Sequence, residues 1–214
     1  MAKPDYIYLV RHGESVGNVK RDTYNTVPDW KIPLTTKGIK QARDAGKKLV
    51  EKIGIGDVAM YCSPWIRARQ TAAEIRKKLR VVKYYEDPRL REQEWGNYRE
   101  PPLAKKIERE RYKFGSFFYR MPYGESGADV FDRISSFFDT LYRDFEDFIY
   151  PRNIIIVTHG LTIKTFLMRF YHWSVEDFDS YKTPGNCVVI EMEKQYEKYT
   201  LNTKLRKRPG RKAK

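Results

Sequence analysis

Short runs of continuous apolar residues, separated by longer amphipathic segments, constrain this chain more than any other feature of its sequence. The runs cover residues 6–10, 58–61 and 154–157, and they are rich in β-branched and aromatic side chains. They do not alternate apolar with polar residues, which is typical of strands that are buried on both faces of a parallel sheet. A fourth, late strand is predicted from Cys187 to Met192.

The segments between these runs have the apolar spacing of helices. After Thr35 and Thr36, either of which can cap a helix, apolar residues recur with helical period up to Ile53. Ser63-Pro64 predicts a second helix, with Ser63 as its N-cap and Pro64 at its first position. Two further helices are predicted after Ser126 and over residues 161–170. Alternating strands and helices indicate an α/β fold, which we expect to be a three-layer α/β/α sandwich with a mostly parallel central sheet.

The chain shows no internal repeat and no Gly/Ser-rich linker, so residues 1–203 are predicted to form one domain. Residues 96–122 are an insertion that we expect to be helical, with many basic and aromatic side chains. Residues 204–214 carry seven Lys or Arg residues and no acid, so they supply half of the net charge of +14. A segment of that composition cannot bury a core, and we expect a disordered basic tail.

Composition also predicts where in the cell the protein is located. The longest aliphatic run has four residues, far short of the roughly 20 that a membrane-spanning helix needs. The mean hydropathy of −0.72 also argues against an integral membrane protein. The N-terminus lacks a signal-peptide pattern and there are only two cysteines, which favours reduced thiols in the cytoplasm. Import to the nucleus through the basic tail is the alternative.

Three strand-to-helix junctions carry cationic or potentially cationic side chains. The junction at residues 7–15 contains Arg11 and His12, the one at 61–67 contains Arg67, and the one at 155–160 contains His159. Ligands of open α/β sheets bind at the carboxyl ends of the strands, where these side chains would meet. Two guanidinium groups and two imidazoles around one point would bind a phosphoryl group well.

Competing motifs fit the sequence less well. Gly13, Ser15 and Gly17 match the nucleophile elbow of α/β-hydrolases, but that elbow needs a helix directly after the serine. Residues 18–31 are polar, contain a proline and have no helical stripe. The segment from Cys62 to Arg67 lacks the glycines of a phosphate-cradling cysteine loop. The histidines and acids have no metal-ligand spacing, so neither a metal nor a cofactor is predicted.

Arg11-His12-Gly13-Glu14-Ser15, followed by Asn18, resembles the signature of the histidine phosphatase superfamily, in the branch that includes cofactor-dependent phosphoglycerate mutase. The resemblance extends over residues 6–192. It includes Leu34-Thr35, Ser63-Pro64 with Arg67, Leu90-Arg91-Glu92, Gly124-Glu125-Ser126 and Thr158-His159-Gly160. Residues 26–34 and 114–133 look closest to phosphoglycerate mutase-like phosphatases described as broad-range acid phosphatases. The resemblance implies a phosphoglycerate mutase-like fold.

The resemblance also implies roles for individual residues. His12 would attack phosphorus and become a phosphohistidine, while Arg11, Arg67 and His159 hold the nonbridging oxygens. Glu92 matches the family's proton donor. Glu94 lies two residues further on, and spacing alone does not choose between the two acids; the family pattern around them selects Glu92. Ser15 and Asn18 match positions that contact the phosphate in relatives.

The family contains both phosphatases and mutases. Phosphoglycerate mutases have Asn directly after His-Gly, where this chain has Leu161, and Tyr three residues after the acid, where it has Trp95. Both departures favour a phosphatase that hydrolyses phosphate monoesters of small molecules, with mutase-type phosphoryl transfer as the alternative. The basic insertion, with Lys105, Lys106 and Arg109, either lines a pocket for an acidic substrate or forms a solvated helix face.

A hypothesis of another class starts from the basic tail. Residues 204–214 could bind nucleic acid or another polyanion, and the catalytic residues would then be incidental. The tail has no aromatic residue that could stack on bases, which disfavours this alternative.

Overall fold

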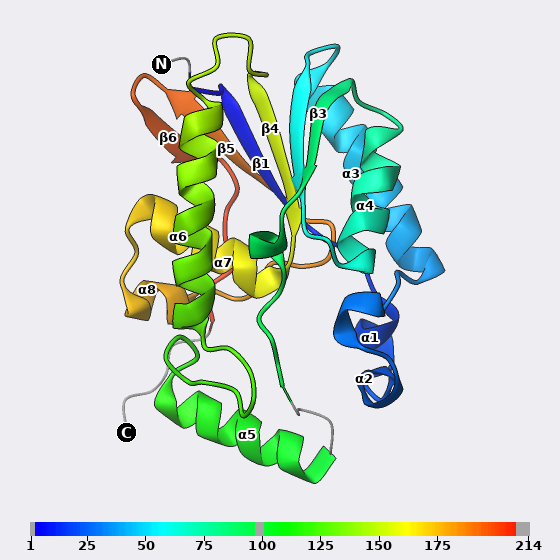
Figure 1. Ribbon diagram of the computed structural model, residues 1–214, viewed down its shortest axis with the longest axis vertical. Coiled ribbons are helices and arrows are strands. Elements are labelled where there is room, and N and C mark those ends of the chain that lie inside the picture. Colours follow the sequence, from blue (N-terminus) through cyan, green and yellow to red (C-terminus); the bar gives the residue numbers. More distant parts are fainter. Residues whose placement is uncertain (1–2, 97–100, 209–214) are drawn as a thin grey trace.

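A six-stranded sheet with the strand order β3-β2-β4-β1-β5-β6 runs through the centre of the protein (Figure 1). The computed structural model describes residues 3–96 and 101–208. The strands are β1 (Tyr6–Arg11), β2 (Val58–Cys62), β3 (Val81–Glu86), β4 (Asn153–Thr158), β5 (Val189–Gln195) and β6 (Lys198–Leu201). The helices are α1 (Val16–Val19), α2 (Thr23–Thr26), α3 (Thr36–Ile53), α4 (Ile66–Arg76), α5 (Pro101–Phe114), α6 (Gly127–Asp144), α7 (Gly160–Tyr171) and α8 (Val175–Ser180), with 3-10 turns η1 (Asp29–Lys31) and η2 (Pro88–Leu90).

Four neighbouring strands, β3, β2, β4 and β1, are parallel, and β5 and β6 extend the sheet in the antiparallel sense. The three strands predicted from apolar runs are confirmed, and the late strand begins at Val189 rather than at Cys187. Sequence reasoning missed β3 and β6. Both lie at the edges of the sheet and are largely exposed, so their sequences mix apolar with charged residues.

Helices cover both faces of the sheet, which confirms the predicted α/β sandwich (Figure 1). Successive residues of a strand point to opposite faces. Ile7 and Leu9 of β1 therefore join the core under α6, α7 and α8, whereas Tyr8 and Val10 join the core under α3 and α4. Strands β1, β2 and β4 are buried on both sides, as their continuous apolar sequences require.

The structure agrees with two of the predicted helix starts and differs at a third. The Thr35 side chain accepts a hydrogen bond from the Gly38 N–H at 3.0 Å and caps α3 as expected. Ser126 caps α6 in a capping box with Asp129. The prediction that Ser63 and Pro64 open the next helix is wrong, because the chain stays extended through Trp65 and α4 begins at Ile66. The predicted helix of the insertion is α5, and residues 97–100 lie outside the described residues.

The basic C-terminal segment differs from the expected disordered tail over residues 204–208. The Lys182 N–H donates to the Arg206 carbonyl at 2.8 Å, and the Arg208 N–H donates to the Ser180 carbonyl at 2.7 Å. Leu205 packs against the core beneath α6 and α7. Backbone hydrogen bonds and the packing of Leu205 thus attach residues 204–208 to the domain, although their composition predicts a solvated segment. Residues 209–214 lie outside the described residues.

Several short elements gather at the carboxyl ends of the parallel strands, where α1, α2 and α5 lie at one end of the molecule (Figure 1). The segment after β1 passes very close to the first turn of α3. A Cβ atom on Gly38 would lie 2.1 Å from the Glu14 carbonyl oxygen, so only glycine permits this approach. Among the described residues, no helix has the length and apolar character that crossing a bilayer requires.

We predict that Gly38→Ala destabilises the protein, because the added methyl group must push the segment containing Glu14 away from α3. Overpacking of this kind lowers the free energy of unfolding by about 1–3 kcal/mol. Urea denaturation followed by circular dichroism measures the change. Lys40→Ala, at an exposed position of the same helix, is the control. Equal stability of the two variants would contradict the close contact.

Candidate active site

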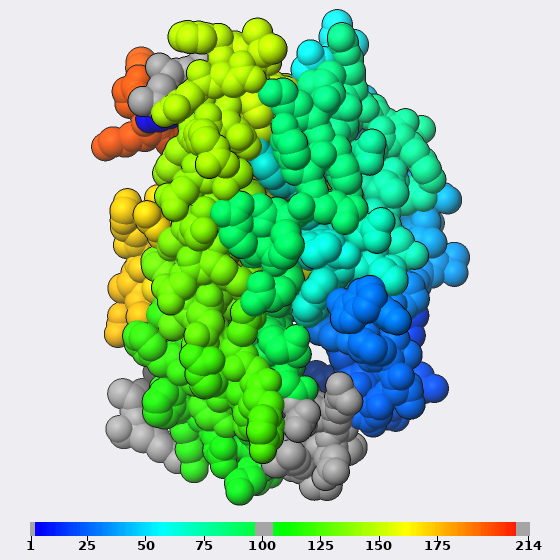
Figure 2. All heavy atoms as spheres, viewed as in Figure 1, coloured from blue at the N-terminus to red at the C-terminus, as the bar shows by residue number. Residues whose placement is uncertain are grey.

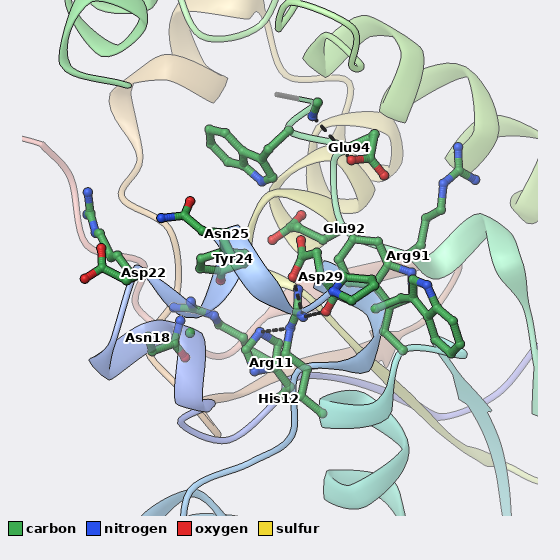
Figure 3. Close-up of a pocket in the computed structure, with 18 of the residues that line it drawn as sticks. Arg11, His12, Asn18, Asp22, Tyr24, Asn25, Asp29, Arg91, Glu92 and Glu94 are labelled. Atoms are coloured by element: carbon green, nitrogen blue, oxygen red, sulfur yellow. Dashed lines mark hydrogen bonds and ion pairs between the residues drawn. The ribbon is translucent and has the colours of Figure 1, made fainter. Parts of the chain in front are cut away.

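A cavity of about 1040 Å³ opens at the carboxyl ends of the parallel strands. Figure 2 shows a recess between the blue segment, which carries α1 and α2, and the green residues near α5. The walls of the cavity combine acidic, basic and aromatic side chains (Figure 3). The charged and aromatic residues among them are Arg11, His12, Arg21, Asp22, Tyr24, Asp29, Trp30, Trp65, Arg67, Arg91, Glu92, Glu94, Trp95, Lys105 and Glu108.

His12 lies directly after β1 and is buried at the base of this cavity. Its Nδ1 atom is 2.7 Å from the Gly13 carbonyl oxygen, which can only accept, so Nδ1 carries the proton. The Nε2 atom therefore has a free lone pair, which accepts a hydrogen bond from Arg67 Nε at 3.2 Å. Burial, together with the guanidinium groups of Arg67 and Arg11, holds the pKa of His12 well below its usual value. Its imidazole is consequently neutral at neutral pH, with Nε2 unprotonated.

Arg67 comes from the first turn of α4 and is almost completely buried. Its Nη1 atom donates to Asp29 twice, to the carboxylate Oδ1 at 2.7 Å and to the backbone carbonyl at 2.8 Å. The ring of Trp65 lies 4.6 Å from the guanidinium carbon. A paired and stacked guanidinium of this kind has a fixed orientation, with its charge beside His12.

Arg11 approaches the same point from the last position of β1. Its Nη1 donates to the Pro184 carbonyl oxygen at 2.7 Å, which leaves its other nitrogens to the site. The Nε atom is buried and has no hydrogen-bond partner among the described residues. An arginine stays charged even though burial lowers its pKa, so Arg11 offers a cationic donor that an anion could satisfy.

His159 is brought to His12 by the pairing of β4 with β1, in which Thr158 lies opposite Arg11. The two imidazole rings are 5.1 Å apart between centroids and meet edge to face. Nε2 of His159 lies 2.8 Å from Ser63 Oγ, while its buried Nδ1 lacks a hydrogen-bond partner within the described part of the chain. His159 is fully buried and does not line the cavity, so it adjoins His12 from behind the cavity wall.

Both candidate acids line the cavity, but they are held differently (Figure 3). The Glu92 carboxylate accepts from the Leu161 and Thr162 N–H groups, each at 3.3 Å, in the first turn of α7. Glu94 is exposed, and its side chain accepts only from the nearby Gly96 N–H at 3.3 Å among the hydrogen bonds found in residues 3–96 and 101–208. The structure therefore fixes the position of Glu92 more firmly than that of Glu94.

The two further phosphate-contact candidates lie on opposite sides of the cavity wall. Asn18 lines the cavity, and its Oδ1 accepts from the Ser15 N–H at 3.0 Å and from Asn186 Nδ2 at 3.1 Å. Asn186 also donates to the His12 carbonyl oxygen at 3.0 Å, so it links Asn18 to the backbone of His12. Ser15 is fully buried and does not reach the cavity. The structure thus brings Asn18, but not Ser15, to the surface that a substrate would meet.

Sequence reasoning missed four residues that support this site: Tyr24, Asp29, Ser63 and Asn186. Ser63 and Asn186 contact His159 and the His12 backbone, whereas Asp29 pairs with Arg67 and Tyr24 lines the cavity. Asp29 and Tyr24 lie in the polar segment that has no strong helical or strand pattern. No spacing connects that segment to Arg67, because their contact depends on the tertiary fold.

We predict that His12 remains neutral as the pH falls through 6.5, where an unperturbed histidine would gain its proton. Arg11→Gln removes one of the cations that lower the pKa of His12, so the pKa should rise. Titration of ¹⁵N-labelled histidine side chains by NMR measures both values. Arg43→Gln, on the outer side of α3, is the charge-matched control and should leave the titration unchanged. A wild-type His12 that titrates near pH 6.5 would overturn the assignment.

Comparisons with known proteins identify the family of this chain. The sequence model of the histidine phosphatase superfamily (branch 1) matches residues 7–205. The phosphoglycerate mutase-like protein AT74 of Arabidopsis thaliana is 42% identical over 205 residues, which cover 89% of this chain and 65% of that protein. This chain thus spans slightly less than two thirds of the length of AT74.

Two other relatives align over most of both chains. The broad-range acid phosphatase DET1 of Saccharomyces cerevisiae is 27% identical, and the alignment covers 96% of this chain and 91% of DET1. The solved structure of Bacillus stearothermophilus YhfR has a TM-score of 0.74 and 26% identity, with 92% of this chain and 95% of that chain covered. These matches confirm the family predicted from the motif around His12: the chain belongs to branch 1 of the histidine phosphatase superfamily.

Proposed function

We propose that the protein hydrolyses phosphate monoesters of small molecules through a phosphohistidine formed on His12 Nε2. One observation carries the proposal above all others. The tautomer of His12, fixed by the Gly13 carbonyl, presents an unprotonated nitrogen to a cavity in which two arginines supply positive charge. A neutral nucleophile between cationic donors suits attack on a phosphate ester, whose transition state spreads negative charge over three oxygens.

In the first step Nε2 attacks phosphorus in line with the ester oxygen. The N–P bond forms as the P–O ester bond breaks, and the Glu92 carboxylic acid gives its proton to the departing alkoxide. The guanidinium groups of Arg11 and Arg67 neutralise the nonbridging oxygens. His159 lies behind His12, where its neutral ring adds no positive charge beside the imidazolium ring of the phosphohistidine that forms.

In the second step the Glu92 carboxylate removes a proton from water, and the resulting hydroxide attacks phosphorus. The O–P bond forms, the N–P bond breaks, and inorganic phosphate leaves with His12 restored to its neutral form. Hydrogen bonds from the first turn of α7 hold Glu92 in place for both steps. Asn18, tied to the His12 backbone through Asn186, is a further contact for the phosphoryl group.

Two features support hydrolysis over a mutase reaction. A mutase must keep water out and bind the second acidic group of its substrate. Leu161, the residue directly after His-Gly, is buried in the apolar core and offers no polar side chain. The cavity is large and open to solvent, so water can reach the phosphoenzyme. We therefore favour a phosphorylated small molecule as the reaction partner and the cytoplasm as the setting, consistent with two free cysteines.

We predict that His12→Asn abolishes release of inorganic phosphate from 4-nitrophenyl phosphate, because no nucleophile remains at the base of the cavity. His172→Asn is the matched control, since His172 lies at the far end of α7 in a left-handed conformation that asparagine accepts. It should retain wild-type activity. Equal phosphate release by wild type and His12→Asn would refute the nucleophile assignment.

We predict that Glu92→Gln lowers kcat for alkyl phosphates by about 10²–10⁴-fold, the usual contribution of a positioned acid. The loss should be smaller for 4-nitrophenyl phosphate, whose leaving group needs little protonation. Glu94→Gln, an equal change on the same cavity wall, tests the competing acid. A larger loss in Glu94→Gln than in Glu92→Gln would reverse the assignment. Stopped-time phosphate assays on both substrates give the comparison.

A further inference from the structure

Asp29 is an unexpected group in a site that binds anions. Its side chain is about one-fifth exposed, and it contacts an Arg67 side chain that is 4% exposed. A carboxylate repels a phosphoryl group, so its presence at the cavity wall needs a compensating role. Burial raises the pKa of Asp29, and the Arg67 guanidinium, which donates to the carboxylate at 2.7 Å, opposes this rise.

The contacts of Arg67 indicate what that role is. A guanidinium group is planar, and its Nε–H and Nη2–H bonds point from one edge as a two-pronged fork, with Nη1 on another side. Asp29 binds Nη1 through both its carboxylate and its backbone carbonyl. Nε, by contrast, donates to His12 Nε2 at 3.2 Å. The fork edge therefore faces the nitrogen on which phosphorus must arrive.

We propose that Asp29 is the positioning residue of Arg67: by occupying Nη1 from two sides, it aims the Nε/Nη2 fork at two oxygens of the phosphoryl group bound at His12. This inference rests on the proposed function. When substrate enters, a phosphoryl oxygen replaces His12 Nε2 as the acceptor of the Nε–H bond, and the lone pair of Nε2 becomes free to attack. Asp29 keeps its hold on Nη1 throughout, so the fork does not need to be reoriented.

The negative charge of Asp29 has a second effect in the same arrangement. It partly offsets the positive charge of Arg67, which lowers the basicity of His12. The backbone carbonyl of Asp29 makes the same contact whatever the side chain is, so side-chain variants test the carboxylate alone.

Two variants separate orientation from charge. Asp29→Asn keeps an oxygen that can accept from Nη1, whereas Asp29→Leu has similar bulk and no acceptor. Glu86→Gln and Glu86→Leu are the matched controls, because Glu86 pairs with Arg69 on the same helix but outside the cavity. The readouts are kcat/KM for 4-nitrophenyl phosphate, the Ki of inorganic phosphate as a competitive inhibitor, and the melting temperature.

A positioning role predicts that Asp29→Leu loses about tenfold or more in kcat/KM and binds phosphate correspondingly more weakly. Asp29→Asn should stay within about threefold of wild type in kcat/KM, since its hydrogen bond is kept. Both variants should melt below the wild type, because each removes the charge that pairs with the buried Arg67, but both should stay folded at the assay temperature. Both Glu86 variants should keep wild-type activity and phosphate affinity.

The inference fails if Asp29→Leu keeps wild-type kcat/KM and Ki, or if Asp29→Asn loses as much as Asp29→Leu. It also fails if the activity of the variants simply follows their melting temperatures. The His12→Asn enzyme, assayed alongside, separates failure of the Asp29 inference from failure of the proposed function. If His12→Asn is inactive and Asp29→Leu is unchanged, the proposed function stands and only the positioning role of Asp29 is lost.

Discussion

Parallel pairing of β1 with β4 is the constraint on which the site depends. The register that sets Arg11 opposite Thr158 also sets His12 beside His159, because each histidine follows its strand by one residue. Both strands are buried on two faces, so a slip of one residue would turn every core side chain to the wrong layer. The apolar packing of the sheet thereby fixes the distance between the two imidazoles.

The charge state of each group at the site follows from its burial at the ends of β1 and β4. His12 and His159 are kept neutral because burial and nearby guanidinium groups make protonation unfavourable. Arg11 and Arg67 provide the positive charge, and the Asp29 carboxylate offsets part of the charge of Arg67. The site thus pairs an unprotonated imidazole nitrogen with fixed cations, an arrangement that suits an incoming dianion.

The sequence predicted those parts that repeat a local pattern. Continuous apolar runs predicted the buried strands, and Thr35 and Ser126 predicted the starts of α3 and α6. The motifs at the ends of strands predicted the residues that meet around His12. The contacts of Asp29 and Asn186, and the attachment of residues 204–208, could not be predicted, because each joins segments far apart in sequence through irregular backbone. At Ser63-Pro64 a good local capping signal misplaced the start of the helix, since Trp65 remains extended beside Arg67 and His159.

The hydrogen bond from Arg67 Nε to His12 Nε2 has a consequence for the chemical survival of the protein. A neutral imidazole with an exposed lone pair is open to acylation and alkylation by reactive metabolites. Here the lone pair accepts a hydrogen bond from Arg67 at the base of the cavity. An electrophile without oxygens that can accept from Arg67 gains nothing to offset the loss of that bond. In the free enzyme, Arg67 therefore shields His12 Nε2 from such reagents. A phosphoryl group can displace this hydrogen bond because its oxygens accept from Arg67 in place of His12.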